Sequence, residues 1–175
     1  MNKKFWKHVD ELLERVRKSR LQGKAIMDSA LRRMYGFSID DKFRTVDDAV
    51  NALYDDTDKK LCALALLALS VQWKLDVDSE YIPRIKQLAI TESNDDLRGA
   101  ALQSLGAIFE RTNDRQIGII LATVIRDESE PAACRRGAHD GLRCLGGCDD
   151  DDLLPFPESV DWGFVDSFLH PGAPD

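Results

Sequence analysis

The stretch that decides the fold is Asp95-Asp96-Leu97-Arg98-Gly99-Ala100-Ala101-Leu102-Gln103-Ser104-Leu105-Gly106. Its residue types return on both sides of it, at steps of 36 and then 37 residues. The columns are Ala65, Ala101 and Ala138; Leu69, Leu105 and Leu142; Leu61, Leu97 and Cys134; and the small side chains Ala68, Ser104 and Gly141. Large aliphatic residues beside a column of small ones suit a helix that another helix backbone approaches closely. The recurrence predicts a helical repeat array, whose function lies on a surface.

The array divides into three helix pairs, each with a shorter first helix, an acidic turn and a second helix that carries the repeated pattern. We expect the pairs to be Val46–Tyr54 with Lys59–Trp73, Ser79–Ile90 with Asp96–Glu110, and Asp114–Ile125 with Pro131–Leu145. The first helices repeat as well, since Ala49, Ile85 and Leu121 are 36 residues apart. Pro131 suits the first turn of a helix, where its missing amide proton costs nothing.

Composition agrees with an all-α fold class in one modest globular body. The chain has 175 residues, of which 43% are hydrophobic, with abundant Ala and Leu and few aromatic residues. Ala and Leu rank high in helix propensity. No stretch approaches the length of about 20 apolar residues that a membrane span needs. The N-terminus has no apolar core typical of a secretory signal, so we expect a cytoplasmic protein.

Charge separates the chain into a basic head and an acidic body. Residues 1–44 carry twelve Lys and Arg against six Asp and Glu, whereas residues 45–175 carry twelve against twenty-five. The head begins with an amphipathic helix that bears Phe5 and Trp6 and is rimmed by cations. Three interpretations stay open for this helix: a cap on the end of the repeat stack, a membrane-surface anchor, or a partner-binding element.

Three regions follow from these observations: a basic N-terminal helical cap over 1–44, three helix pairs over 45–146, and a C-terminal region over 147–175. Gly146-Gly147 ends the last repeated helix, and we expect the run Asp149–Asp152 to be a solvated acidic loop or, alternatively, the cap of a following helix. Ser159–Leu169 is predicted to be a capping helix with Ser159 as its N-cap. It hides the apolar face of the last repeat, and a mobile tail follows it.

The cysteines are expected to be reduced thiols, since a chain with its own core does not need disulfides. One local group of residues has metal-capable side chains: Cys134, His139, Cys144 and Cys148. Structural zinc sites usually present paired thiols two to four residues apart, twice over, which this group does not. His139 occupies the register of Leu66 and Leu102, which favours a partly buried core histidine. We predict no metal and no cofactor.

An enzymatic function finds no motif to support it. The sequence has no glycine-rich phosphate loop, no zinc-hydrolase histidine pair and no nucleophile elbow. The acidic body disfavours nucleic acid, because neutralising phosphates supplies most of the affinity of nucleic-acid-binding proteins.

The residues 95–106 resemble the signature of HEAT and HEAT-like repeats, in which an acidic turn precedes an aliphatic residue, an arginine, small residues and Leu-Gly. The resemblance covers roughly residues 46–145. The third pair matches less well, with Cys134-Arg135-Arg136-Gly137-Ala138, and the first departs further, with Cys62 in place of the arginine and Ser70 in place of the glycine. The resemblance implies a short right-handed α-α superhelix whose pattern-bearing helices line the concave side.

In such families the turn acid and the arginine form a ladder between neighbouring units. The matching positions imply that Arg98 and Arg135 pair with Asp56, Glu92, Asp127 or Glu128. An arginine one turn into a helix can bridge carboxylates of adjacent units, so these residues are predicted to be structural.

The leading functional prediction is a non-enzymatic scaffold or adaptor that binds a protein on the concave face. Its candidate binding residues are Gln103, Glu110, Asp140 and Arg143. A net acidic surface favours a basic partner and speeds the encounter. Two alternatives stay open: a nucleic-acid-binding or DNA-repair protein of HEAT-like type, and a membrane-peripheral adaptor that uses Phe5, Trp6 and the basic N-terminal helix.

Overall fold

The computed structural model describes residues 42–147, 156–158 and 160–170. Within these ranges the regular secondary structure is entirely helical, which confirms the all-α fold class. The chain divides into two compact units, Met1–Arg44 and Thr45–Asp175. The helix pairs belong to the second unit.

Several predictions lie outside the described residues. They are the amphipathic helix with Phe5 and Trp6, the thiol of Cys148, the acidic run Asp149–Asp152, the N-cap residue Ser159 and the tail after His170.

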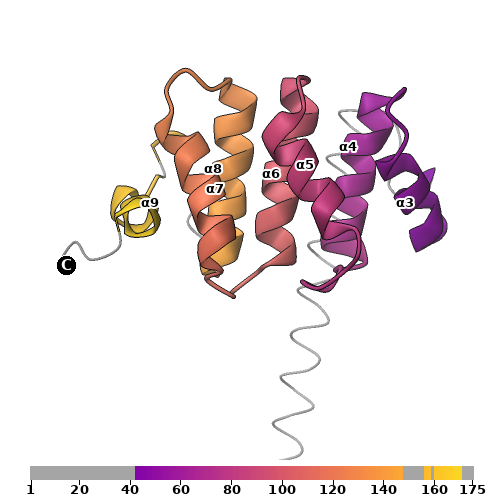
Figure 1. Ribbon diagram of the computed structural model, residues 1–175, viewed down its shortest axis with the longest axis horizontal. Coiled ribbons are helices and arrows are strands. Elements are labelled where there is room, and N and C mark those ends of the chain that lie inside the picture. Colours follow the sequence, from indigo (N-terminus) through magenta and orange to yellow (C-terminus); the bar gives the residue numbers. More distant parts are fainter. Residues whose placement is uncertain (1–41, 148–155, 159, 171–175) are drawn as a thin grey trace, which may run out of the picture. The chain divides into compact units, whose positions relative to one another are not determined.

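The helices follow the predicted order of pairs. Their bounds are α3 Val46–Leu53, α4 Lys59–Leu67, η1 Ala68–Gln72, α5 Ile82–Thr91, α6 Asp95–Ile108, α7 Arg115–Arg126, α8 Ala132–Gly146 and α9 Trp162–Leu169. Helices α4, α6 and α8, which carry the repeated pattern, lie side by side in one row, and α3, α5 and α7 lie in front of them (Figure 1). The turns within the pairs share the upper end of that view, and the connections between pairs share the lower end.

Side-chain caps fix where most of these helices begin. The oxygens of Asp58, Asn94 and Asp114 accept the backbone N–H three residues on, at 2.9, 3.0 and 2.9 Å. Thr45 and Asp48 cap each other reciprocally at the start of α3. Such caps satisfy backbone donors that the first turn of a helix leaves without a partner. Polar cap residues therefore set where α3, α4, α6 and α7 begin.

Three predicted boundaries need correction. Helix α9 begins at Trp162, because the Asp161 carboxylate accepts the Phe164 N–H at 3.0 Å and is the N-cap in place of Ser159. Pro131 is the N-cap of α8, one position before the first turn. Helix α5 begins at Ile82 instead of Ser79.

The expected single helix over Lys59–Trp73 is interrupted. After Leu67 the chain continues as the π-helix η1, in which the Trp73 N–H donates to the Ala68 carbonyl at 3.0 Å. The wider turn contains Ser70, where the first helix pair departs from the repeat pattern. The Ser70 hydroxyl donates to the Ser104 hydroxyl at 3.3 Å. π-Helical turns inside α-helices are rare and are frequent near functional sites.

Helices α6 and α8 pack backbone against backbone. A Cβ added to Gly99 would lie 2.7 Å from the Ala133 carbonyl oxygen, and one added to Gly141 would lie 2.7 Å from that of Leu102. Added Cβ atoms on Gly106 and Gly137 would likewise collide with the backbone of the facing helix. This confirms the prediction from the small-residue column, because only such residues allow this approach.

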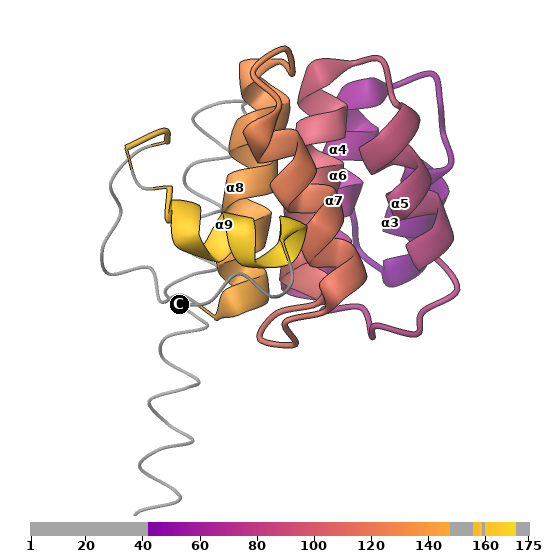
Figure 2. The ribbon, with the colours of Figure 1, turned by 60° about the vertical axis from the view of Figure 1, so that its left-hand side comes forward.

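Helix α9 lies across α7 and α8 (Figure 2). The Phe168 ring fills the space that a side chain at Gly118 would need, and the Phe164 ring does so at Gly146. Arg126 of α7 donates to both carboxylate oxygens of Asp166, at 2.9 and 2.5 Å, and its guanidinium stacks on the Trp162 ring, 4.3 Å from the ring centroid. The left-handed φ of 72° at Gly147 ends α8, as its glycine predicted.

In the described part of the chain, no helix combines the length and the apolar content that crossing a membrane requires.

Candidate functional site

The end of the array that holds the acidic turns repeats one structural contact in each pair. Arg98 Nε donates to the Ala89 carbonyl at 3.1 Å, and Arg135 Nε donates to the Ile125 carbonyl at 3.2 Å. In the first pair Cys62 has the same register, and its Sγ donates to the Leu53 carbonyl at 3.5 Å. Carbonyls in the last turn of a helix have no partner within the helix. In each pair, the side chain at this position of the second helix therefore binds a carbonyl in the last turn of the first helix.

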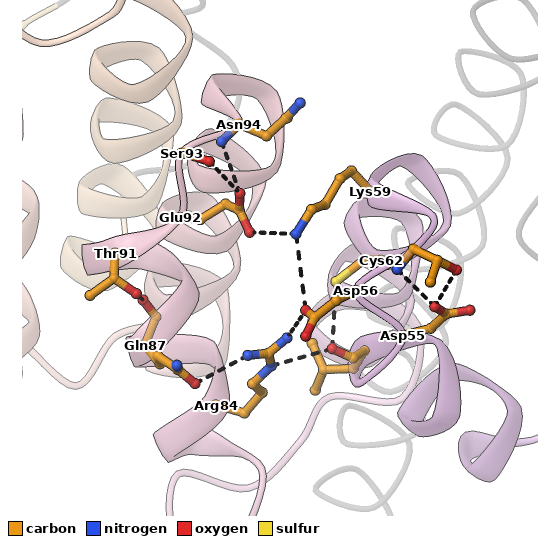
Figure 3. A network of polar contacts seen from close by, with 12 residues as sticks. Asp55, Asp56, Lys59, Cys62, Arg84, Gln87, Thr91, Glu92, Ser93 and Asn94 are labelled. Atoms are coloured by element: carbon orange, nitrogen blue, oxygen red, sulfur yellow. Dashed lines mark hydrogen bonds and ion pairs between the residues drawn. The ribbon is translucent and has the colours of Figure 1, made fainter.

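Arg84 from α5 supplies the guanidinium that the first pair lacks. Its Nε lies 3.5 Å from the Leu53 carbonyl, and its terminal nitrogen lies 2.6 Å from Asp56 Oδ1 (Figure 3). Lys59 joins the same network, with its ammonium 3.0 Å from the Glu92 carboxylate. Both contacts connect the first helix pair to the second.

Glu92 is the least exposed carboxylate in this network, with 8% of its side chain accessible. Burial alone would raise its pKa, but the backbone N–H of Asn94 and the ammonium of Lys59 outweigh burial and hold the pKa below its ordinary value. The carboxylate therefore stabilises the fold in its charged form.

The second and third pairs are connected by Arg98 and Glu130. The two guanidinium nitrogens donate to the two carboxylate oxygens at 2.8 and 2.6 Å. Only 18% of either side chain is exposed. Hydrogen bonding to Glu130 raises the pKa of Arg98. This bidentate geometry is the strong form of the arginine–carboxylate pair.

The ladder partners therefore differ from those that the resemblance implied. Arg98 pairs with Glu130 in place of Asp127 or Glu128, and Arg135 stacks over the Phe156 ring, 5.4 Å from its centroid. Asp127 is occupied locally, because it accepts hydrogen bonds from the backbone and hydroxyl of Ser129, which lower its pKa.

Sequence reasoning missed Glu130 and Arg84. Glu130 belongs to one of the acidic turns, but a charge run does not indicate which of its carboxylates faces the neighbouring pair. Arg84 had a local signal: Cys62 stands in the arginine position and offers the Leu53 carbonyl only a weak thiol donor, so a second donor can bind there.

The four predicted binding residues lie on or directly after the helices that carry the pattern. Gln103 on α6 and Asp140 and Arg143 on α8 are half-buried, and Glu110 is exposed just beyond α6. Gln103 lies where α6 packs against α8, because a Cβ on Gly141 would lie 3.3 Å from the Gln103 Cα, and Asp140 is the residue before Gly141 on α8. Asp140 Oδ1 lies 3.3 Å from Nδ1 of the buried His139. Their role in binding stays a prediction.

The opposite end of the array is hollowed beside the connection between η1 and α5. One hollow of about 580 Å³ lies between this connection and the end of α6, and a second of about 370 Å³ lies on the other side, against Trp73 and Tyr81. Both are lined by Lys74, Leu75, Asp76 and Asp78. The connection is therefore accessible from two sides.

The thiols in the described part are placed as core residues. Cys62 and Cys134 are buried, and burial raises the pKa of both, that of Cys62 to about 11. Among the residues that the structure describes, no three His, Cys, Asp or Glu side chains come together as a metal-binding group. Cys148, one of the four candidates considered for zinc, is not among those residues.

Comparison of the chain with protein-family models, with curated proteins and with solved structures gave no match.

Proposed function

We propose that this chain is a non-enzymatic protein-interaction scaffold, built as a short right-handed HEAT-like superhelix, that binds a basic partner on the concave face formed by α4, α6 and α8. The observation that carries the proposal is the packing of α6 on α8. Their glycines bring the helices so close that a Cβ on Gly141, the residue after Asp140, would lie 3.3 Å from the Gln103 Cα.

The electrostatics of the body support a basic partner. Residues 45–175 hold thirteen more acidic than basic residues. A field of this sign attracts cationic partners and raises the association rate. Cys62 and Cys134 are buried thiols without a disulfide, which supports a reducing compartment such as the cytoplasm.

The small residues on the exposed side of α6 also support a surface for a polypeptide. Ala100, Gln103 and Ala107 are half-buried and follow one another at steps of three and four residues. Residues at this spacing share one face of a helix. A face of alanines with polar side chains between them allows a partner backbone to approach and to form hydrogen bonds.

The test is affinity capture from a native lysate with the tagged full chain and a charge-reversing variant. We expect Gln103→Arg with Asp140→Arg to lose the captured protein, because both changes place a cation where a basic partner would dock. The matched control is Gln116→Arg with Glu128→Arg, which makes the same charge change at exposed positions on α7 and the turn after it.

Two outcomes contradict the proposal. One is a captured protein that the control variant loses as readily as the binding-face variant. The other is recovery of nucleic acid or lipid in place of a protein partner.

A further inference from the structure

The groove beside the connection between η1 and α5 has two walls of different origin. One wall is the connection itself, which follows the π-helix and turns at Lys74, whose φ is 47°. The other is the end of α6, with Ala107 and Ile108, and Glu110 just beyond it. The space between them is about 580 Å³, which is large enough to hold side chains of another molecule.

The floor and walls combine apolar surface with carboxylates. Leu75 and Ala107 are half-buried, and Val77 is 47% exposed. Asp76 and Asp78 alternate with these residues along the connection and are exposed. The groove therefore offers hydrophobic contact and negative charge to the same occupant.

The negative charge of the groove is poorly balanced. The cation that lines it, Lys74, is held by Glu110 with a nitrogen–oxygen distance of 3.0 Å, and Arg111 Nε lies 3.8 Å from the other oxygen of the same carboxylate. In the part of the chain that the structure describes, no ion pair joins a cation to Asp76 or Asp78.

We infer that this groove binds a lysine- or arginine-bearing segment of another protein. Such side chains have an aliphatic stem that packs on apolar surface and a cationic head that stays near water. The stem would lie on Leu75 and Val77, and the head would reach Asp76 or Asp78. The inference rests on the proposed function, because Glu110, one of the predicted binding residues, is on the rim of the groove.

The Lys74–Glu110 pair does not block the groove. Its side chains are 51% and 43% exposed, and an ion pair this accessible to water contributes little to the stability of the fold. A cation of the partner can therefore replace Lys74 at Glu110 with little loss. The exchange would bring a third carboxylate to the bound segment.

The experiment uses the full chain and a blocked six-residue peptide of alternating leucine and lysine. The same peptide with glutamate in place of lysine is the negative probe. Backbone amide shifts are followed by nitrogen-15 NMR during titration. We expect saturable shifts at residues 74–78 and 107–110 with the lysine peptide only, and weaker binding when salt is raised from about 50 to about 300 mM.

The variant Asp76→Asn with Asp78→Asn should weaken peptide binding roughly ten-fold, since it removes two charges from the groove. The control, Asp96→Asn with Glu128→Gln, removes the same charge at the far end of the helices and should bind as the unmodified chain does. The inference is overturned by shifts that centre on the acidic turns, by equal weakening in both variants, or by no saturable binding.

The two proposals fail separately. If the peptide binds the groove while Gln103→Arg with Asp140→Arg still captures the partner, the binding face is wrong and the groove stands. If that variant loses the partner while the lysine peptide leaves residues 74–78 unshifted, the groove alone is wrong.

Discussion

Arg98 and Glu130 form a two-pronged ion pair between the second and third helix pairs, with nitrogen–oxygen distances of 2.8 and 2.6 Å. The same guanidinium uses its Nε to bind the Ala89 carbonyl within its own helix pair. One side chain thus closes a helix and joins two helix pairs. The first and second helix pairs are joined by two cations instead, Arg84 and Lys59.

Replacing Glu130 with Gln is expected to lower the free energy of unfolding by about 1–3 kcal/mol. The variant leaves the largely buried Arg98 guanidinium without its carboxylate, and both side chains are only 18% exposed. The measurement is urea unfolding followed by circular dichroism.

The control for this variant is Glu128→Gln in the same turn, at an exposed position. It should change the stability by less than about 0.5 kcal/mol. Equal losses in the two variants would mean that the Arg98–Glu130 pair contributes nothing beyond the general charge of the turn.

Replacing Gly141 with Ala should destabilise the fold, although alanine favours a helix by about 1 kcal/mol over glycine. The added Cβ would lie 2.7 Å from the Leu102 carbonyl oxygen, so α6 and α8 would have to separate. We expect a net loss of about 2 kcal/mol or more in the free energy of unfolding.

Gly163→Ala in α9 provides the comparison, because its nearest neighbouring atom would be 3.4 Å from the added Cβ. This change should be neutral or stabilising. A stabilising effect at Gly141 as well would show that the close approach of α6 and α8 is wrong.

The sequence predicted the helices well because their signals are local. The spacing of Ala101 and Ala138 indicated the register, and the column with Gly141 indicated a close approach that the structure confirms. The pairing of Arg98 with Glu130 was not predictable, since three carboxylates of one turn compete and only tertiary packing selects among them. The π-helix after Leu67 had no signal beyond the departure at Ser70.

The sequence indicates residues of the candidate binding face, but it does not indicate the candidate groove. Gln103 and Asp140 are predictable because they follow the repeat register. The groove depends on how the connection after Lys74 folds back beside α6, and connections between repeats follow no periodicity. The register also indicates Glu110, but only the structure shows that it is on the rim of a groove.

Cys62 and Cys134 should resist alkylation in the folded protein. The thiolate is the reactive form, and burial raises the pKa of Cys62 to about 11 and that of Cys134 above its ordinary value. Treatment with iodoacetamide at about pH 8, followed by peptide mass spectrometry, should label both only after unfolding in urea. Rapid labelling of either thiol in the native protein would contradict its position in the core.

The Lys59–Glu92 pair should make stability depend on acid. The pKa of Glu92 is held below its ordinary value of 4.5 in the folded state, so its contribution is complete above about pH 4.5 and is lost as the pH falls through the lower, folded value. The free energy of unfolding is therefore expected to decrease between about pH 6 and about pH 3. Lys59→Met should reduce this decrease, because the ammonium is one cause of the lowered pKa.

The matched control is Lys60→Met at the neighbouring position. Lys60 is exposed, and among the described residues it forms no ion pair with a carboxylate. Urea unfolding at the two pH values compares the variants. If Lys59→Met and Lys60→Met keep the same dependence on acid, the carboxylate of Glu92 is stabilised by its backbone hydrogen bonds alone. Lys59 would then join the first two helix pairs without setting how they respond to pH.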